Sequence, residues 1–305
     1  MRDAFVKALI EEGKKDSNII LVTGDLGYGV LDEFQQELPS QFINSGVNEQ
    51  TMMGMAAGIA STGKRVFVYS IGNFPTLRCL EQIRNDVCLM NNPVVIVSVG
   101  AGYAYGPQGY THHALEDISV TRALHNLDVI APADPIETRQ ITKLLCKTKS
   151  PTYLRLGRSN EIQLVNNDYS LVENKVNEIR QGEHGTLLFI GSIGSIALEA
   201  HEILKSEGID VSVASSPFIS HPDLNYLKDA IGKGPLVAIE EHGLRGGFGS
   251  SILEALYNTE RSPAIGLIGS KCKDLSLVGS RDFLLEANDL TTKEVVRKFK
   301  SLMES

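Results

Sequence analysis

Apolar residues in this chain gather into short continuous runs, separated by longer stretches of mixed character. In a first series, the runs fall at residues 18–25, 65–72, 93–100, 127–134 and 151–158. A strand that is apolar at every position is typical of a parallel sheet buried on both faces. Helix-length stretches lie between the runs, so the sequence predicts an α/β fold.

The alternation stops and then starts again further along the chain. Residues 166–185 are mostly polar, and apolar runs return at residues 186–194, 209–218, 235–243 and 264–270. A shift of composition of this kind marks a boundary between domains. The sequence therefore predicts two doubly wound domains, at residues 1–165 and 186–305, joined by a linker at residues 166–185.

Composition narrows the classes of function. The chain has 305 residues, a formal net charge of −8 and a pI near 5.4, which argues against a nucleic-acid-binding surface. The first residues carry acids, unlike a secretory signal, and no apolar run approaches the roughly 18 residues that would suggest a membrane span. We therefore expect a cytoplasmic protein without a membrane partner. Its four cysteines lack a metal-binding spacing and are expected to be reduced.

A lone acid, Glu49, opens a stretch of small and apolar residues that carries no further charge until Lys64. Such a stretch is expected to form a helix buried on most sides. In one interpretation, Glu49 is a first-turn acid that follows the N-cap Asn48 and is favoured by the helix dipole. In the other, it is a buried carboxylate with a raised pKa, able to share a proton with a bound heterocycle.

Ligands of open α/β sheets bind beyond the carboxyl ends of the strands, and the loops there hold this chain's unusual residues. His112 and His113 follow one strand, where imidazoles can transfer protons near neutral pH. A metal role is weaker, because neighbouring histidines cannot readily bind one ion. A surface pair that caps the next helix remains open. Arg158, just past another strand, could hold a carboxylate or phosphate, whereas a structural salt bridge is favoured for Arg155.

Several segments occur in the order found in one enzyme family. The segments GVNEQTMMGMAAGIASTGKRVFVYS, GYTHH, PADPIETRQ and LRLGRSN resemble the pyrimidine-binding half of transketolase, and VAIEEHGLRGGFGSS resembles that family's C-terminal domain. The resemblance covers nearly the whole chain. It implies the cofactor thiamine diphosphate and the transfer of a two-carbon ketol unit from a ketose donor to an aldose acceptor.

The resemblance also implies roles for individual residues. Glu49 matches the family glutamate that bonds the aminopyrimidine of the cofactor. Asp25 matches an acid near the cofactor ring, and Phe74 matches the aromatic residue that stacks on the pyrimidine. His112 matches the histidine that handles substrate hydroxyl protons.

Substrate recognition follows the family pattern only in part. Arg158 matches an arginine that binds a sugar phosphate, but Gln108 stands where many transketolases hold an acid. The predicted substrate site therefore comprises Gln108, His112, His113 and Arg158. The departure at Gln108 suggests a nonstandard sugar.

Half of a transketolase active site is absent from the sequence. The GDG…N motif that binds Mg2+ and thiamine diphosphate in the family's N-terminal half has no counterpart, since TGDLGYG is not that motif. The chain thus resembles the C-terminal subunit of a split transketolase, which would assemble with a separate N-terminal subunit. The resemblance further implies self-association to a dimer, giving a heterotetramer with two sites.

Three other functions stay open. The β subunit of a 2-oxoacid dehydrogenase shares the two-domain plan, and failure to acylate lipoamide would separate it from a transketolase. A non-catalytic scaffold could keep the fold without turnover, although Glu49 and His112 are not needed for packing. A nucleotide-binding oxidoreductase is the weakest alternative, because no dinucleotide-binding fingerprint follows the first strand.

Overall fold

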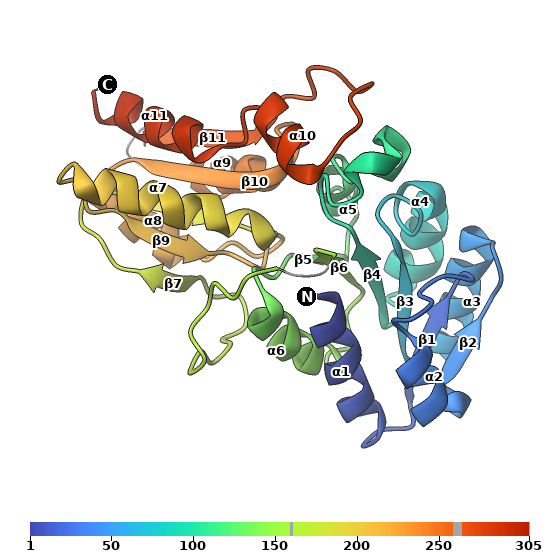
Figure 1. The fold of residues 1–305 in the computed structure, drawn as a ribbon. Coiled ribbons are helices and arrows are strands. Elements are labelled where there is room, and N and C mark those ends of the chain that lie inside the picture. The colour runs from blue at the N-terminus through green and yellow to red at the C-terminus, as the bar shows by residue number, and fades with distance from the viewer. Residues whose placement is uncertain (159–160, 259–263, 305) are drawn as a thin grey trace.

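The computed structural model describes residues 1–158, 161–258 and 264–304. Two sheets flanked by helices lie side by side, the first built from the N-terminal half of the chain and the second from the C-terminal half (Figure 1). The predicted α/β fold class is confirmed, except that the second sheet is mixed rather than wholly parallel. Within the described ranges, no helix is long and apolar enough to cross a membrane.

The first sheet contains six parallel strands in the order β2-β1-β3-β4-β6-β5. The strands are β1 (Ile19–Thr23), β2 (Phe42–Asn44), β3 (Arg65–Ile71), β4 (Val94–Val99), β5 (Asp128–Ile130) and β6 (Thr152–Leu156). All except β2 coincide with predicted apolar runs. The pattern missed β2 because this edge strand has only three residues, none of them fully buried.

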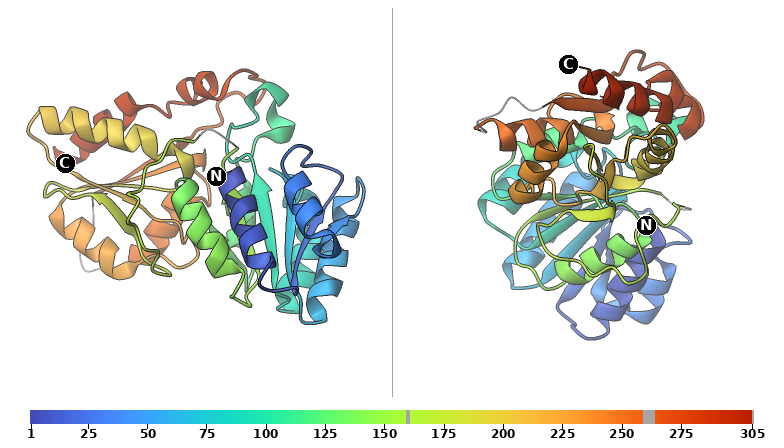
Figure 2. Two further views of the ribbon diagram at one scale, coloured as in Figure 1. Left: turned by 60° about the horizontal axis from the view of Figure 1, so that its bottom comes forward. Right: turned by 90° about the vertical axis from the view of Figure 1, so that its left-hand side faces the viewer.

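Helices cover both faces of the first sheet (Figure 2). They are α1 (Arg2–Gly13), α2 (Asp32–Glu37), α3 (Glu49–Ser61), α4 (Leu80–Gln82), α5 (Asp117–Arg122) and α6 (Pro135–Leu145), with a π-helix at Ile83–Leu89. Alternate residues of β1 point to opposite faces. Ile19 and Leu21 share a buried cluster with residues of α1, whereas Ile20 and Val22 share one with residues of α3. Burial on both faces explains why residues 19–22 of β1 are all apolar.

The second sheet contains five strands in the order β11-β10-β8-β9-β7, and β7 runs antiparallel to β9. The strands are β7 (Asn177–Arg180), β8 (Thr186–Phe189), β9 (Ser212–Ser215), β10 (Leu236–Gly243) and β11 (Ile265–Ser270). The helices are α7 (Gly194–Ser206), α8 (Leu224–Lys233), α9 (Phe248–Leu256), α10 (Arg281–Ala287) and α11 (Thr292–Met303). The strand β7 lies inside the segment predicted as a linker. It is a partly exposed edge strand in which three of the four residues are polar, so no apolar run reveals it.

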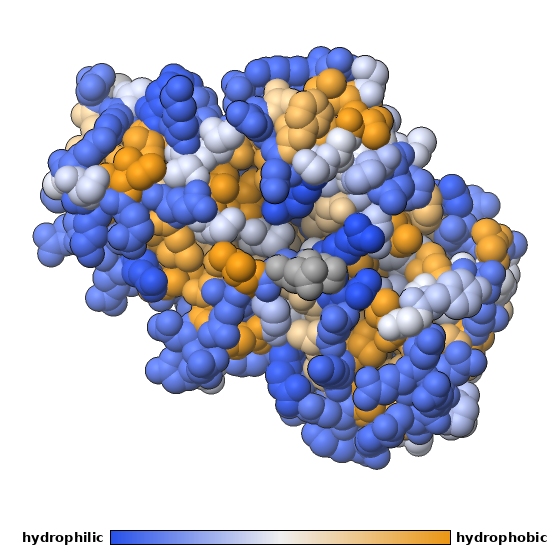
Figure 3. Space-filling view, viewed as in Figure 1, coloured by the Kyte–Doolittle hydropathy of each residue, from blue (hydrophilic) through white to orange (hydrophobic). Residues whose placement is uncertain are grey.

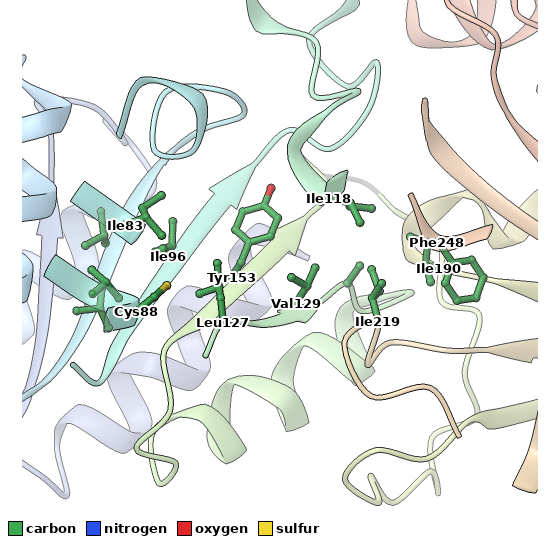
Figure 4. Packing of buried hydrophobic residues seen from close by; sticks show 14 of the residues in the cluster. Ile83, Cys88, Ile96, Ile118, Leu127, Val129, Tyr153, Ile190, Ile219 and Phe248 are labelled. Atoms are coloured by element: carbon green, nitrogen blue, oxygen red, sulfur yellow. The ribbon is translucent and has the colours of Figure 1, made fainter. Parts of the chain in front are cut away.

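The two halves share part of their core. One buried cluster includes Tyr153 of β6, Ile219 after β9 and Phe248 of α9 (Figure 4). The backbone also joins them, since the amide of Ala131 donates to the carbonyl of Pro217 at 2.8 Å. All four cysteines are unpaired, as predicted, and burial raises the pKa of Cys88 to about 11, which keeps this thiol protonated at neutral pH.

Candidate functional site

The predicted site residues lie in loops at the carboxyl edge of the first sheet. These loops follow β1, β2, β3, β4 and β6, which are neighbours in the sheet. Because the five strands are parallel, the loops that follow them meet at one edge. Residues that are far apart in the sequence can therefore contribute to one site.

Glu49 is the first residue of α3, and it is buried. The side-chain oxygen of Asn48 accepts a hydrogen bond from the amide of Thr51 at 3.2 Å, which confirms the predicted N-cap. Met52 and Met53 are fully buried in the same turn. The Glu49 side chain is only 7% exposed. Glu49 is therefore both a first-turn acid and a buried carboxylate, so these two parts of the two interpretations hold together.

Arg78, which the sequence analysis did not single out, lies against Glu49. Its Nη1 donates to Oε2 of Glu49 at 2.8 Å. The guanidinium carbon also lies 4.8 Å from the ring centroid of Phe74, a cation–π geometry. The only signal in the sequence was a single charge in an otherwise neutral loop after β3. Arg78 thus contacts Glu49 and Phe74, two of the three residues predicted to bind the cofactor.

His112 joins this group from the loop after β4. Its ring centroid lies 5.2 Å from that of Phe74, edge-on, and 6.4 Å from that of Tyr105. Its Nδ1 shares a hydrogen bond of 3.0 Å with Oγ1 of Thr111. The imidazole is partly exposed, so a ligand beside Phe74 could reach it.

His113 has different surroundings. The side chain is buried, its ring packs edge-on against Tyr103 at 5.2 Å, and Nε2 lies 3.3 Å from the carbonyl oxygen of Gly106. Burial lowers the pKa of His113, which favours the neutral ring. The structure therefore places this histidine in the packing of the loop, apart from the group around Glu49.

Asp25 and Gln108 lie in loops at the same edge. The Asp25 carboxylate accepts hydrogen bonds from Nδ2 of Asn44 at 3.0 Å and from the hydroxyl of Tyr28 at 2.8 Å. These two bonds lower the pKa of Asp25. Gln108 is exposed. In the described part of the chain, neither residue is hydrogen-bonded to Glu49.

Arg158 lies just past β6, with its guanidinium carbon 4.9 Å from the ring centroid of Tyr105. Because the same ring neighbours His112, Tyr105 connects the two residues. Ser159 and Asn160, the rest of the RSN motif, lie outside the described residues. Arg155 is buried and its Nε donates to Oδ2 of Asp117 at 2.7 Å, which confirms the predicted structural salt bridge.

Glu49, Phe74 and His112 fit the aminopyrimidine half of thiamine diphosphate. A buried carboxylate can bond a ring nitrogen, and an aromatic face can stack on a heterocycle. Within the described ranges, no group of three or more His, Cys, Asp or Glu residues could hold a metal ion. The residues of this chain therefore fit the pyrimidine, whereas the described part of the chain offers no such group for Mg2+.

Comparison with known proteins identifies the family of both domains. Residues 1–162 match the family model described as transketolase, pyrimidine binding domain, and residues 174–280 match that of the transketolase C-terminal domain. The chain is 34% identical over 271 residues to a subunit of the apulose-4-phosphate transketolase of Phocaeicola vulgatus, covering 88% of this chain and 86% of that protein. It is 36% identical over 272 residues to the putative transketolase C-terminal section of Methanocaldococcus jannaschii, covering 88% and 85%.

A solved structure extends the agreement to the arrangement of both domains. It is described as a split gene transketolase, inactive beta4 tetramer, and is similar to this chain with a TM-score of 0.89 and 31% sequence identity. The match covers 99% of this chain and 97% of that chain. The predicted family is thereby confirmed: the chain belongs to the transketolase family and has the pyrimidine-binding and C-terminal domains of a split transketolase.

Proposed function

We propose that this chain is the C-terminal subunit of a cytoplasmic, thiamine diphosphate-dependent transketolase that moves a two-carbon ketol unit from a ketose to an aldose. The observation that carries the proposal is the buried Glu49 carboxylate at the carboxyl edge of the first sheet, which Arg78 links to Phe74 and its neighbour His112. A separate N-terminal subunit would bind the diphosphate and Mg2+ and complete the site. Two copies of each subunit would form a heterotetramer.

When bound, thiamine diphosphate supplies an electron sink for cleavage of a carbon–carbon bond beside a ketone. Glu49 would hold N1′ of the aminopyrimidine through a hydrogen bond, which is stronger where water is excluded. Phe74 would stack on the pyrimidine face. His112 would accept and return the proton of a substrate hydroxyl, a task suited to an imidazole, which has both an accepting and a donating nitrogen.

Gln108 and Arg158 would contact the sugar at the mouth of the site. Arg158 has a planar fork of donors that matches a phosphate group. The relative from Phocaeicola vulgatus is named for a phosphorylated sugar, which supports a phosphorylated substrate for this chain as well. His113, buried in the loop, would support the position of His112 rather than contact the sugar.

The test is a donor-cleavage assay with hydroxypyruvate, thiamine diphosphate and Mg2+. The chain is assayed alone, with its N-terminal partner, and with the partner and Glu49→Gln in place of the wild type. We expect activity only in the mixture, and a loss of at least about 100-fold in the variant because proton transfer through Glu49 is removed. Glu286→Gln, the same change at an exposed carboxylate outside this group, is the matched control.

Each alternative function gives a different result in the same assay. Reductive acylation of lipoamide from a 2-oxoacid would identify a 2-oxoacid dehydrogenase subunit. A complex that forms on a sizing column but cleaves no donor would support a non-catalytic scaffold. Full activity of the Glu49→Gln mixture would reject the role of Glu49.

A further inference from the structure

We propose that a cavity at the junction of the two domains binds the phosphate-type oxyanion of a small molecule. The cavity has a volume of about 390 Å³, and its lining includes Arg158 of the first domain and Ser192, Ser195 and Arg281 of the second. The surface around the junction of the two halves shows both hydrophilic and apolar residues (Figure 3). The proposal goes beyond the role that the family resemblance gives Arg158, because three of these groups come from the C-terminal domain.

The cavity lies where the topology of the second sheet favours a ligand. From β8 the chain passes to β9 on one side and then returns to β10 on the other. The point where strand order reverses, outside the carboxyl ends of the strands, is the usual ligand crevice of an open α/β sheet. Ser192 and Ser195 follow β8, and Arg281 is bonded to Glu241 of β10. Both sides of the crevice therefore contribute to the cavity.

Arg281 is held in place but keeps unused donors. Its Nε and Nη2 donate to the Glu241 carboxylate at 2.5 to 3.1 Å, and Nη2 lies 3.5 Å from Oγ of Ser192. Glu241 is fixed in turn, because it accepts from the amide of Tyr103 at 2.8 Å. In the described part of the chain, Nη1 of Arg281 donates no hydrogen bond. A fixed guanidinium with free donors is suited to binding an anion.

Arg158 supplies the uncompensated charge of the cavity. The carboxylate of Glu161, which also lines the cavity, is paired with the N-terminal ammonium of Met1 at 2.8 Å. Arg281 is likewise balanced by Glu241. Among the described residues, Arg158 has no carboxylate partner and rests only on the ring of Tyr105. An anion in the cavity would therefore find one excess positive charge.

The turn between β8 and α7 leaves room for the anion. Gly191 has a φ of 65°, and a Cβ added there would meet nothing within 4 Å. The helix α7 begins without a side-chain cap. Among the described residues the hydroxyls of Ser192 and Ser195 donate no hydrogen bond, so both are available to an oxyanion, which the helix dipole also favours.

The first test measures binding of inorganic phosphate to the whole chain, by 31P line broadening and by the phosphate-dependent rise in Tm at constant ionic strength. The variants are Arg158→Gln and Ser195→Asp, with Arg84→Gln as a matched loss of one exposed charge. Ser195→Asp places an acid in the first turn of α7, which favours the helix while repelling an anion. It therefore separates loss of binding from loss of folding.

We expect the wild type and Arg84→Gln to bind phosphate equally, and the two cavity variants to bind about tenfold more weakly. Equal phosphate effects in all four proteins, or no effect in the wild type at tens of millimolar phosphate, would overturn the proposal. The result does not depend on transferase activity, so it stands or fails separately from the proposed function.

A second experiment identifies the source of the oxyanion in the assembled enzyme. Kinetics are compared for phosphorylated and unphosphorylated forms of the same ketose donor. If the cavity receives the end of the substrate, Ser195→Asp raises KM for the phosphorylated donor alone and phosphate competes with it. If the ligand is a separate phosphate compound, the variant changes the response of both donors to added phosphate, without competition. If added phosphate affected the kinetics of Ser195→Asp and the wild type equally, both the substrate and the separate phosphate compound would be excluded as ligands of this cavity.

Discussion

The ion pair between Glu49 and Arg78 joins a buried carboxylate to a half-exposed cation: the two side chains are 7% and 51% exposed. Arg78 touches both Glu49 and the face of Phe74, which are the surfaces that would hold an aminopyrimidine. In the proposed complex, the cofactor ring would take the place that this cation occupies. Arg78 would therefore have to move when the cofactor enters.

Removing Arg78 should tighten cofactor binding. A partly exposed ion pair contributes at most about 1 kcal/mol, and a cation–π contact contributes a similar amount. We expect Arg78→Gln, in the assembled enzyme, to lower the Kd of thiamine diphosphate about fivefold by calorimetric titration, with Arg84→Gln unchanged. A rise in Kd would show instead that Arg78 positions Glu49 for the cofactor.

The ion pair of Arg155 and Asp117 differs from that of Glu49 and Arg78, because both of its side chains are almost fully buried. It donates to Asp117, to the carbonyl of Ala114 and to the carbonyl of Glu241 in the second domain. Burial opposes the charge of Asp117, but Arg155 and His242 together hold the pKa of this carboxyl below its ordinary value. The pair thus connects the two domains through satisfied charges.

Replacing only one partner of this ion pair should destabilise the folded protein. We expect Arg155→Met to lower the free energy of unfolding by about 3 to 5 kcal/mol, because an unpaired carboxylate stays buried. The double variant Arg155→Met/Asp117→Asn should recover part of the loss in chemical denaturation. If the double variant were less stable than the sum of the single changes, the buried charge of Asp117 would not be the cause.

At the scale of elements, the carboxyl end of β10 carries three buried titratable side chains, Glu240, Glu241 and His242. Glu240 accepts from the amides of Phe248 and Gly249, and Glu241 pairs with Arg281. Burial raises the pKa of Glu240 to about 7 and lowers the pKa of neighbouring His242 to about 4. The first four residues of the strand are apolar, and Glu240 and His242 near its carboxyl end favour their neutral forms.

These two groups should give opposite pH dependences of stability. Glu240 keeps its proton longer in the folded state, so its contribution falls as pH rises from about 4.5 to about 7. His242 takes up a proton later in the folded state, so its contribution rises from about pH 4 to about pH 6.5. The two slopes partly cancel in the wild type.

Without the Glu240 carboxyl, the pH dependence of stability should follow the titration of His242 more closely. We expect the gain in unfolding free energy from pH 5 to pH 7 to be larger in Glu240→Gln than in the wild type, by about 1 to 3 kcal/mol. Denaturant titrations at both pH values measure it, with Glu286→Gln as an exposed carboxylate control. Parallel pH profiles for the wild type and Glu240→Gln would contradict the assignment.

At the scale of the whole molecule, two large side chains next to the candidate site are strongly exposed. Val47, just before Glu49, and Tyr28, bonded to Asp25, are both 76% exposed. Large apolar side chains so exposed at one edge are typical of a surface that another chain covers. This edge is where the proposed N-terminal subunit would bind.

We expect Val47→Asp to weaken association with the N-terminal subunit at least about tenfold, because a charge would be buried at the interface. Met303→Asp, at the exposed end of α11, is the control and should associate normally. Surface-plasmon titration of the two subunits gives the affinities, and thermal unfolding shows that both variants fold. Normal association of Val47→Asp would place the partner on another face.

Much of the fold and part of the candidate site could be predicted from local sequence. Buried strands leave continuous apolar runs, and the apolar helix behind Glu49 already implied that its carboxylate is buried. The N-cap Asn48 acts over three residues and could be predicted for the same reason. The edge strands β2 and β7 escaped prediction because short, half-exposed strands have no such pattern.

The order of strand and helix segments, the burial of Glu49 and the family were thus determined by the sequence itself, through patterns that extend over a few residues or along one motif. The tertiary structure alone decided which side chains meet. Arg78 reaches Glu49 across 29 residues, and His112 and His113, although adjacent, face different surroundings. The cavity between Arg158 and Arg281 likewise exists only because two domains pack together. Such contacts depend on how distant segments are oriented in space, which no local pattern encodes.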